Sequence, residues 1–238
     1  MNVQWEAAWQ AVIHHPLFGV AITLAAFQLS YAAYEKTRWV FLQPVLVSML
    51  MVVGVLLACG LGYEDYRLSA QMLTVMLGPA TVALAVPLYL NLRRIRELFG
   101  PIMITLLVGG ITATALGMAL AWAFGADRMV LMTLAPKSVT SPIAMLVAEQ
   151  IGGVVALAAV FVMITGILGA IFGPELLRRF GVQHPAARGM ALGLTAHAVG
   201  TAQALQESEE CGAFAALAMS LMGVLTAVLL PLVVSLSL

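Results

Sequence analysis

The chain has 238 residues, of which 62% are hydrophobic and only 9% charged, and its formal net charge is zero. This composition is typical of a membrane protein with several spans, and it excludes a nucleic-acid-binding protein, which would need a basic surface. The two cysteines, Cys59 and Cys211, lie far apart and have neither metal-site spacing nor a disulfide pattern.

Apolar segments follow one another along the chain, each near the ~20 residues that cross a bilayer core. They cover residues 17–34, 40–61, 72–92, 101–124, 129–150, 153–172, 190–205 and 213–236. The predicted fold class is therefore all-α and polytopic, with about 7–8 membrane segments and broken helices. We expect residues 1–238 to form a single transmembrane domain.

The basic residues between these segments indicate how the chain is threaded. Suppose that the central segment, 129–150, is re-entrant and leaves on the face it entered. One side then holds Lys36, Arg38, Arg93, Arg94, Arg96, Arg178, Arg179 and Arg188. The other side holds only Arg67 and Arg128, together with the acidic loop ESEECG at 207–212. A full crossing would divide the same residues evenly. Because cytoplasmic loops carry the basic excess, the pattern favours the re-entrant segment and a cytoplasmic C-terminus.

With that threading, the three spans before the central segment run opposite to the three after it. Inverted triplets are common in secondary transporters. We therefore predict inverted repeats, with halves 40–124 and 153–238 on either side of the central segment.

The stretch TLAPKSVTSPIA, residues 133–144, interrupts the central segment with two prolines and one lysine. Pro136 and Pro142 each remove a helical hydrogen bond, and irregular backbone in a membrane must be buried in protein or line a wet cavity. Lys137 is costly in a span unless it meets water, an anion or a partner. We predict a small-anion site here. The alternative is a kinked helix whose lysine reaches the membrane interface.

Hydroxyl groups beside the lysine are candidates to donate hydrogen bonds to the same anion, namely Ser138, Thr140 and Ser141. Bonding back to helix carbonyls, which is common in membrane spans, is the alternative for each of them. A half-helix that begins after Pro142 would also aim free N–H groups at an anion.

His197 is the second ionisable candidate, in the segment LTAHAVGTA with Thr195 and Thr201. Histidine can relay protons or meet an anion, but a lone histidine in an apolar helix is often a hydrogen-bonded packing residue. Thr81 is the one hydroxyl within the predicted break of the third segment, where packing is the alternative to substrate binding. The predicted helix breaks are Gly78, Pro79, Pro87, Pro136, Pro142, Gly193 and Gly200.

No catalytic or metal-binding motif occurs in the sequence: there is no GxSxG, no HExxH and no phosphate loop. We therefore predict that the protein is not an enzyme and needs no cofactor or metal.

Three stretches strongly resemble the LrgB/CidB family of bacterial membrane proteins. They are LGPATVALAVPLY at 77–89, APKSVTSPIA at 135–144 and ARGMALGLTAHAVGTAQALQ at 187–206. That family is described as antiholin-like, regulating murein hydrolase export and cell lysis with a smaller LrgA/CidA-type partner. Its plant relative is the plastidal glycolate/glycerate translocator.

The resemblance implies a multi-pass protein of the bacterial inner membrane that transports small monocarboxylates resembling glycolate, glycerate or pyruvate. It also implies an LrgA/CidA-type partner, because the chain matches only the LrgB half of the plant protein. The alternative is an antiholin-like regulator that acts through protein–protein contacts. Whether the chain forms a homo-oligomer is left open.

Overall fold

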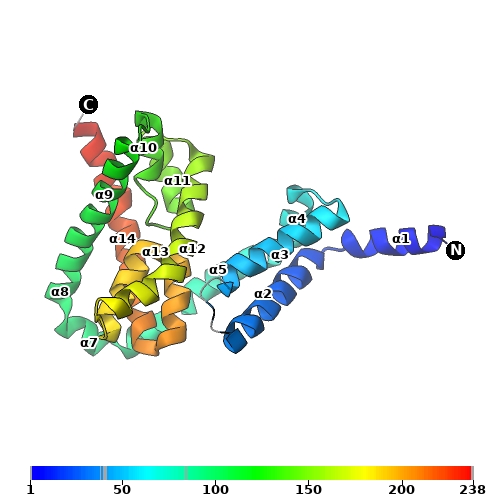
Figure 1. Cartoon of the computed structure of the whole chain (residues 1–238), viewed down its shortest axis with the longest axis horizontal. Coiled ribbons are helices and arrows are strands. Elements are labelled where there is room, and N and C mark those ends of the chain that lie inside the picture. Colours follow the sequence, from blue (N-terminus) through cyan, green and yellow to red (C-terminus); the bar gives the residue numbers. More distant parts are fainter. Residues whose placement is uncertain (1, 38, 40–41, 84, 237–238) are drawn as a thin grey trace. The chain divides into compact units, whose positions relative to one another are not determined.

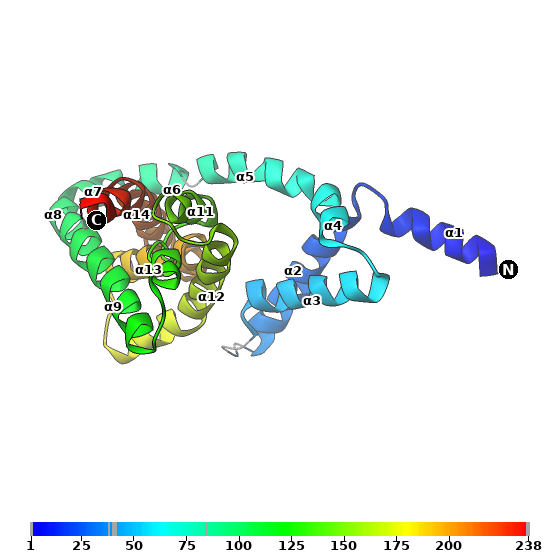
Figure 2. The same ribbon diagram turned by 90° about the horizontal axis from the view of Figure 1, so that it is seen from above.

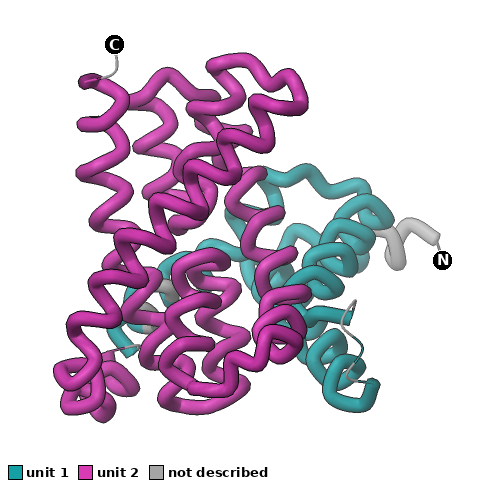
Figure 3. Tube along the Cα trace, turned by 60° about the vertical axis from the view of Figure 1, so that its left-hand side comes forward, with its two compact units in different colours: residues 1–83 teal, residues 84–238 magenta. Residues whose placement is uncertain are grey.

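The computed structural model describes residues 2–37, 39, 42–83 and 85–236; within them, the side chains of residues 2–6, 77, 80 and 81 are not described. All regular elements in these ranges are helices. The chain divides into two compact units, residues 1–83 and 84–238, shown in different colours in Figure 3. Each unit is described by itself.

Unit 1 comprises α1 (Asn2–Ile13), α2 (Phe18–Thr37), α3 (Pro44–Cys59), α4 (Tyr63–Ser69) and α5 (Gln71–Ala83). Helices α2 and α3 lie side by side (Figure 2), as expected of consecutive antiparallel spans. A Cβ on Gly19 would lie 2.4 Å from Oγ of Ser69, so this glycine lets α4 approach α2.

Unit 2 comprises α6 (Ala85–Leu90), α7 (Leu92–Glu97), α8 (Phe99–Ile104), the π-helical turn Thr105–Gly109, α9 (Gly110–Ala123), α10 (Arg128–Leu134), α11 (Ser141–Gln150), α12 (Val155–Arg179), α13 (Pro185–Glu207) and α14 (Glu209–Leu236). Its core is built around the buried Phe214, Val162 and Leu106. Figure 1 shows α12, α14 and the stretch from α8 through α9 running along the length of this unit.

Three helical stretches among the described residues are long and apolar enough to cross a membrane: Phe99–Ala123, Val155–Arg179 and Glu209–Leu236. Two bent pairs in unit 1 raise the number to five if each pair is one span: α1 from Ala7 with α2, and α3 with α4. The all-α membrane fold is thereby confirmed. These spans confirm neither the predicted 7–8 segments nor the inverted repeats.

The predicted central segment consists of two short helices, α10 and α11, separated by residues 135–140. Oγ1 of Thr133 donates to the carbonyl of Met129 and accepts the N–H of Val154 at 2.8 Å, so the end of the segment returns to α10. A Cβ on Gly153 would lie 2.9 Å from the backbone of Thr133. Helices of 7 and 10 residues are about 10 and 15 Å long, each short of the ~30 Å core.

Helix α13 is itself a hairpin. His197 has φ 42° and ψ −126°, a conformation that non-glycine residues rarely adopt, and it reverses the chain within the helix. The ends of a straight 23-residue helix would be roughly 30 Å apart. Instead, Arg188 in the first arm donates to Glu207 in the second at 2.7 and 2.9 Å. A Cβ on Gly200 would lie 2.3 Å from the carbonyl oxygen of Leu192, so the two arms pack closely.

The prediction that residues 190–205 cross the membrane is therefore wrong for this segment. Hydrophobic length alone suggested a crossing, but the left-handed residue at its centre turns the chain back.

The base of the α13 hairpin lies at a charged end of unit 2. There Arg94 lies 3.2 Å from His184 and 3.7 Å from Glu210. The acidic loop before α14 thus lies at the same end of unit 2 as the arginines of α7, whereas the predicted threading put this loop on the side opposite them. The predicted cytoplasmic C-terminus rested on that threading and is overturned with it. We call this end, which carries Arg94 and Arg188, the basic end.

Three predicted breaks in the third segment also need correction. Helix α5 runs through Gly78 and Pro79 without interruption, and α6 contains Pro87. A proline removes one N–H and bends a helix, but neighbouring turns keep their hydrogen bonds, so the helix need not end.

Candidate functional site

The polar centre of unit 2 begins with Lys137, in the turn between α10 and α11. Its backbone N–H donates to the carbonyl of Leu134 at 3.0 Å, and that of Val139 donates to Pro136 at 3.3 Å, which shapes the turn. The side chain crosses to α9, where Nζ donates to the carbonyl of Ala113 at 3.0 Å. Nζ also lies 3.4 Å from Oγ of Ser138.

A glycine in α9 makes this crossing possible. A Cβ on Gly117 would lie 2.7 Å from Cε of Lys137 and 3.2 Å from its Nζ. Ala113 and Gly117 lie in the middle part of the Phe99–Ala123 span, not at its end. The lysine head is thus held at mid-span, contrary to the alternative in which it reaches the membrane interface.

The charge of Lys137 has no opposite charge beside it. Within the described residues, no carboxylate lies within ion-pair distance of Nζ, whose partners are one carbonyl and one hydroxyl. An ammonium group in a membrane span is normally paired or in contact with water or a ligand. This arrangement leaves the ammonium group able to bind a small anion.

The predicted hydroxyl groups surround the start of α11. Ser138 is buried, Thr140 is the N-cap residue without a side-chain capping bond, and Ser141 is the first helical residue. The first hydrogen bond of the helix runs from Ala144 to Thr140. The N–H groups of Ser141 and Ile143 precede it and belong to the unsatisfied first turn, where anions bind well.

His197 lies at the tip of the α13 hairpin and is buried. Its Nε2 lies 3.1 Å from the carbonyl oxygen of Val162 in α12. Because a carbonyl can only accept, Nε2 carries a hydrogen, and Nδ1 is the nitrogen that can gain or lose a proton. A Cβ on Gly166 would lie 2.6 Å from Cε1 of His197, so this glycine provides the space for the ring.

The threonines near His197 have different surroundings. Thr201 is buried; its hydroxyl donates to the carbonyl of His197 at 2.8 Å and lies 3.8 Å from the sulfur of Met219. The hydroxyl of Thr195 bonds back to Ala191 in its own helix, and the residue is exposed. The side chain of Thr81 lies outside the described residues. Of these candidates, the structure brings only Thr201 into contact with His197.

The predicted breaks in unit 2 have distinct roles. Pro136 lies in the turn after α10, and Pro142 is in the first turn of α11, where a proline is well tolerated. Gly193 is helical, and a Cβ on it would lie 2.1 Å from the carbonyl oxygen of Ala215 in α14. Gly193 therefore serves close helix contact, whereas His197 makes the reversal.

The two chain reversals share one apolar cluster. Val139 follows Lys137 by two residues, and Val162 supplies the carbonyl bound by His197; both belong to the buried cluster around Phe214. Lys137 and His197 themselves are not hydrogen-bonded to each other. Sequence reasoning did not identify Ala113 or Gly166, although glycines within apolar spans signal close approach.

Comparison with protein families matches residues 23–236 to the LrgB-like family. The chain belongs to this family. Two Bacillus subtilis proteins described as uncharacterized, YxaC and YwbG, are 36% and 35% identical to it, each over 90% of this chain and 94% and 95% of their own lengths. The antiholin-like protein LrgB of Bacillus cereus is 30% identical over 91% of this chain and 95% of its own. No solved structure matches significantly.

Membership of the LrgB-like family gives the two hairpins a context. The segments that carried the family resemblance at 135–144 and 187–206 are the turn around Lys137 and the two arms of α13. Two of the three stretches that carried the resemblance therefore coincide with the two chain reversals of this LrgB-family chain. Such reversals within a membrane survive only where protein or a wet cavity surrounds them.

Proposed function

We propose that this LrgB-family protein transports small monocarboxylates, of the size and charge of glycolate, glycerate or pyruvate. The observation that carries the proposal is the Lys137 ammonium at mid-span, with one carbonyl and one hydroxyl as partners and no carboxylate. A carboxylate of the substrate supplies the missing negative charge.

The neighbouring groups suit a carboxylate of this size. Ser138 and the first N–H groups of α11 can donate hydrogen bonds to its oxygens, as helix N-termini do for other anions. Interrupted helices that hold a substrate near the membrane midplane are a recurring feature of secondary transporters. In this proposal, His197 and Thr201 of the α13 hairpin contribute to substrate binding. Nδ1 of His197 accepts a hydrogen bond from a hydroxyl of the substrate, or it binds a coupled proton.

The orientation in the membrane follows from the basic end. Within unit 2, Arg93, Arg94, Arg96, Arg178, Arg179 and Arg188 belong to segments at this end, whereas Arg128 follows the opposite end of α9. The positive-inside rule assigns the basic end to the cytoplasm of a bacterial inner membrane. The α13 hairpin then enters from the cytoplasmic side and the α10–α11 hairpin from the outer side.

A protein partner of the LrgA/CidA type is part of the proposal, because the family resemblance covers only one half of the plant translocator. Transport should therefore be measured with the purified chain alone and with such a partner in the same vesicles.

The second candidate function is regulation of cell lysis through protein contacts. The observation that favours it is the name antiholin-like protein carried by the relatives from Bacillus cereus. Such a role needs a bound protein and no substrate flux.

Uptake of radiolabelled glycolate, glycerate and pyruvate into proteoliposomes tests the proposal, with a Lys137→Met variant reconstituted at the same density. Saturable uptake that this variant loses supports transport. The absence of flux for every carboxylate, both with and without the partner, together with tight partner binding would reject transport in favour of the regulatory role.

A further inference from the structure

The structure has a second polar feature, at the basic end and away from the two hairpins. A groove of about 530 Å³ is lined by Tyr89 and Leu90 of α6, and by Leu92, Arg93, Arg96 and Glu97 in α7. It lies at the change from the apolar sequence AVPLYL to the charged sequence NLRRIRE. A change of this kind marks the boundary between the hydrocarbon core and the head groups of a membrane.

The charges in the groove do not cancel. Glu97 pairs with Arg93 at 3.2 Å and with Arg94 at 3.4 Å, and Arg94 also reaches Glu210 at 3.7 Å. Arg96 forms no ion pair or hydrogen bond within the described residues. The groove lining therefore contains two guanidinium groups and one carboxylate, which leaves a net positive charge.

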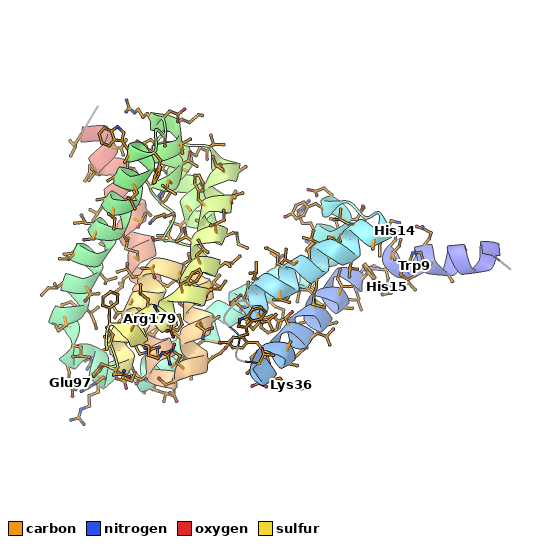
Figure 4. The ribbon with its side chains drawn as sticks, in the orientation of Figure 1. Trp9, His14, His15, Lys36, Glu97 and Arg179 are labelled. Atoms are coloured by element: carbon orange, nitrogen blue, oxygen red, sulfur yellow. The ribbon has the colours of Figure 1, made fainter. Side chains whose placement is uncertain are left out.

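The rest of the lining is apolar and exposed. Tyr89 is 76% exposed and Leu90 64%, so both side chains present apolar surface to the surroundings of α6. Tyrosine prefers the membrane interface, where its ring meets acyl chains and its hydroxyl meets water. Figure 4 shows Glu97 at the lower end of unit 2 in that view, where α7 lies.

We propose that this groove binds an anionic phospholipid, with Arg93 and Arg96 on its phosphate and with Tyr89, Leu90 and Leu92 against its acyl chains. Arginine binds phosphate oxygens through its planar donor fork, and basic pockets on the cytoplasmic side of membrane proteins suit anionic head groups. A free phosphate would use the arginines but leave the apolar lining in water. A zwitterionic lipid would fill the lining but bring no net charge to the guanidinium groups.

The test is lipid titration of the purified full chain, followed by native mass spectrometry, with phosphatidylglycerol, phosphatidylcholine and inorganic phosphate as separate probes. The groove variant is Arg93→Gln with Arg96→Gln. The matched control is Arg178→Gln with Arg179→Gln, because these arginines lie at the end of α12, pair with Glu175 and do not line the groove.

We expect phosphatidylglycerol to bind more tightly than phosphatidylcholine, and inorganic phosphate not to displace it at equal concentration. Each arginine near an anionic surface contributes about fivefold in affinity, so the groove variant should lose about 25-fold for phosphatidylglycerol. The control should lose less than about threefold, since its two arginines are paired with Glu175 and do not line the groove. Equal affinity for the two lipids, equal losses in both variants, or displacement by phosphate alone would each overturn the proposal. This result is independent of whether Lys137 binds a carboxylate.

Discussion

Arg188 and Glu207, nineteen positions apart in one helix, form a two-pronged ion pair that joins the bases of the two α13 arms. Both side chains are largely shielded, with 16% and 22% of their area exposed. Arg188 also donates to the carbonyl of Val182 at 3.1 Å, which ties the loop before α13 to the same point. The hydrogen bonds that Arg188 donates to Glu207 raise the pKa of Arg188 above its ordinary value.

The first prediction concerns this pair. Glu207→Gln should destabilise the protein by roughly 1–3 kcal/mol, because a charge-assisted hydrogen bond is lost and Arg188 is left without its counter-charge. Since the pKa of Arg188 is raised, the contribution of the pair is fully present below the unfolded-state pKa of arginine and is lost only as pH rises through the folded-state value. The stability difference between the variant and the original protein should therefore be constant from pH 6 to 9, measured by thermal unfolding in detergent.

The control for that prediction is Glu64→Gln, which removes an exposed i,i+3 pair with Arg67 and should cost at most about 1 kcal/mol. Equal losses in the two variants would mean that the α13 hairpin does not depend on its ion pair.

The second prediction concerns the anion site. Lys137→Met should lower carboxylate affinity by about 30-fold or more, since losing a desolvated charge pair costs roughly 2–5 kcal/mol. Lys137→Arg should also impair binding, because a planar guanidinium does not fit the space over Gly117 that the lysine stem occupies. Ser138→Ala should cost about 1 kcal/mol, the value of a neutral hydrogen bond.

The other lysine of the chain, Lys36 in the last turn of α2, provides the matched control. Lys36→Met removes the same charge from an exposed position and should leave carboxylate binding unchanged when normalised to the amount of protein in the membrane. Wild-type affinity in Lys137→Met would refute the anion site and shift attention to His197.

A third prediction concerns the space for His197. Gly166→Ala places a methyl group against the imidazole, which must move away from the carbonyl of Val162, at a cost of about 1–3 kcal/mol in stability. The melting temperature and the carboxylate affinity of this variant should both fall. Gly54→Ala in α3 is the control, because no neighbouring atom lies within 4 Å of the added carbon and alanine favours helix. A Gly166→Ala variant as stable as Gly54→Ala would contradict the described fit of the imidazole.

The fourth prediction concerns threading. In a cysteine-free background, Phe180→Cys and Glu209→Cys should react with a membrane-impermeant reagent from one face of the membrane. Phe124→Cys and Glu149→Cys should react from the other face. Reaction of positions 180 and 209 from opposite faces would restore a full crossing for residues 190–205.

Much of the helical architecture could be predicted from the sequence, because apolar length determines where spans lie. The spans at Phe99–Ala123, Val155–Arg179 and Glu209–Leu236 correspond to predicted segments. Prolines at 136 and 142 correctly indicated the interruption beside Lys137, since a proline pair with polar residues is hard to accommodate in one helix.

The second reversal could not be predicted in the same way. It depends on one histidine with a left-handed backbone, held by a carbonyl from α12 and by an ion pair between residues distant in sequence. Local propensity gives no sign of such a conformation, because tertiary contacts impose it. For the same reason, Gly78 and Pro79 were expected to break a helix that continues through them.

The close contact between α13 and α14 has a consequence for how the protein enters its membrane. Cβ atoms on Gly189 and Gly193 would lie 2.2 and 2.1 Å from the carbonyl oxygens of Cys211 and Ala215, so the first arm is in backbone contact with α14. Each arm is too short and too polar at its base to partition into lipid by itself, whereas α14 is apolar enough to do so. We therefore expect insertion of the hairpin to depend on α14, and a released chain that is truncated after Ser208 should leave residues 185–207 at the membrane surface.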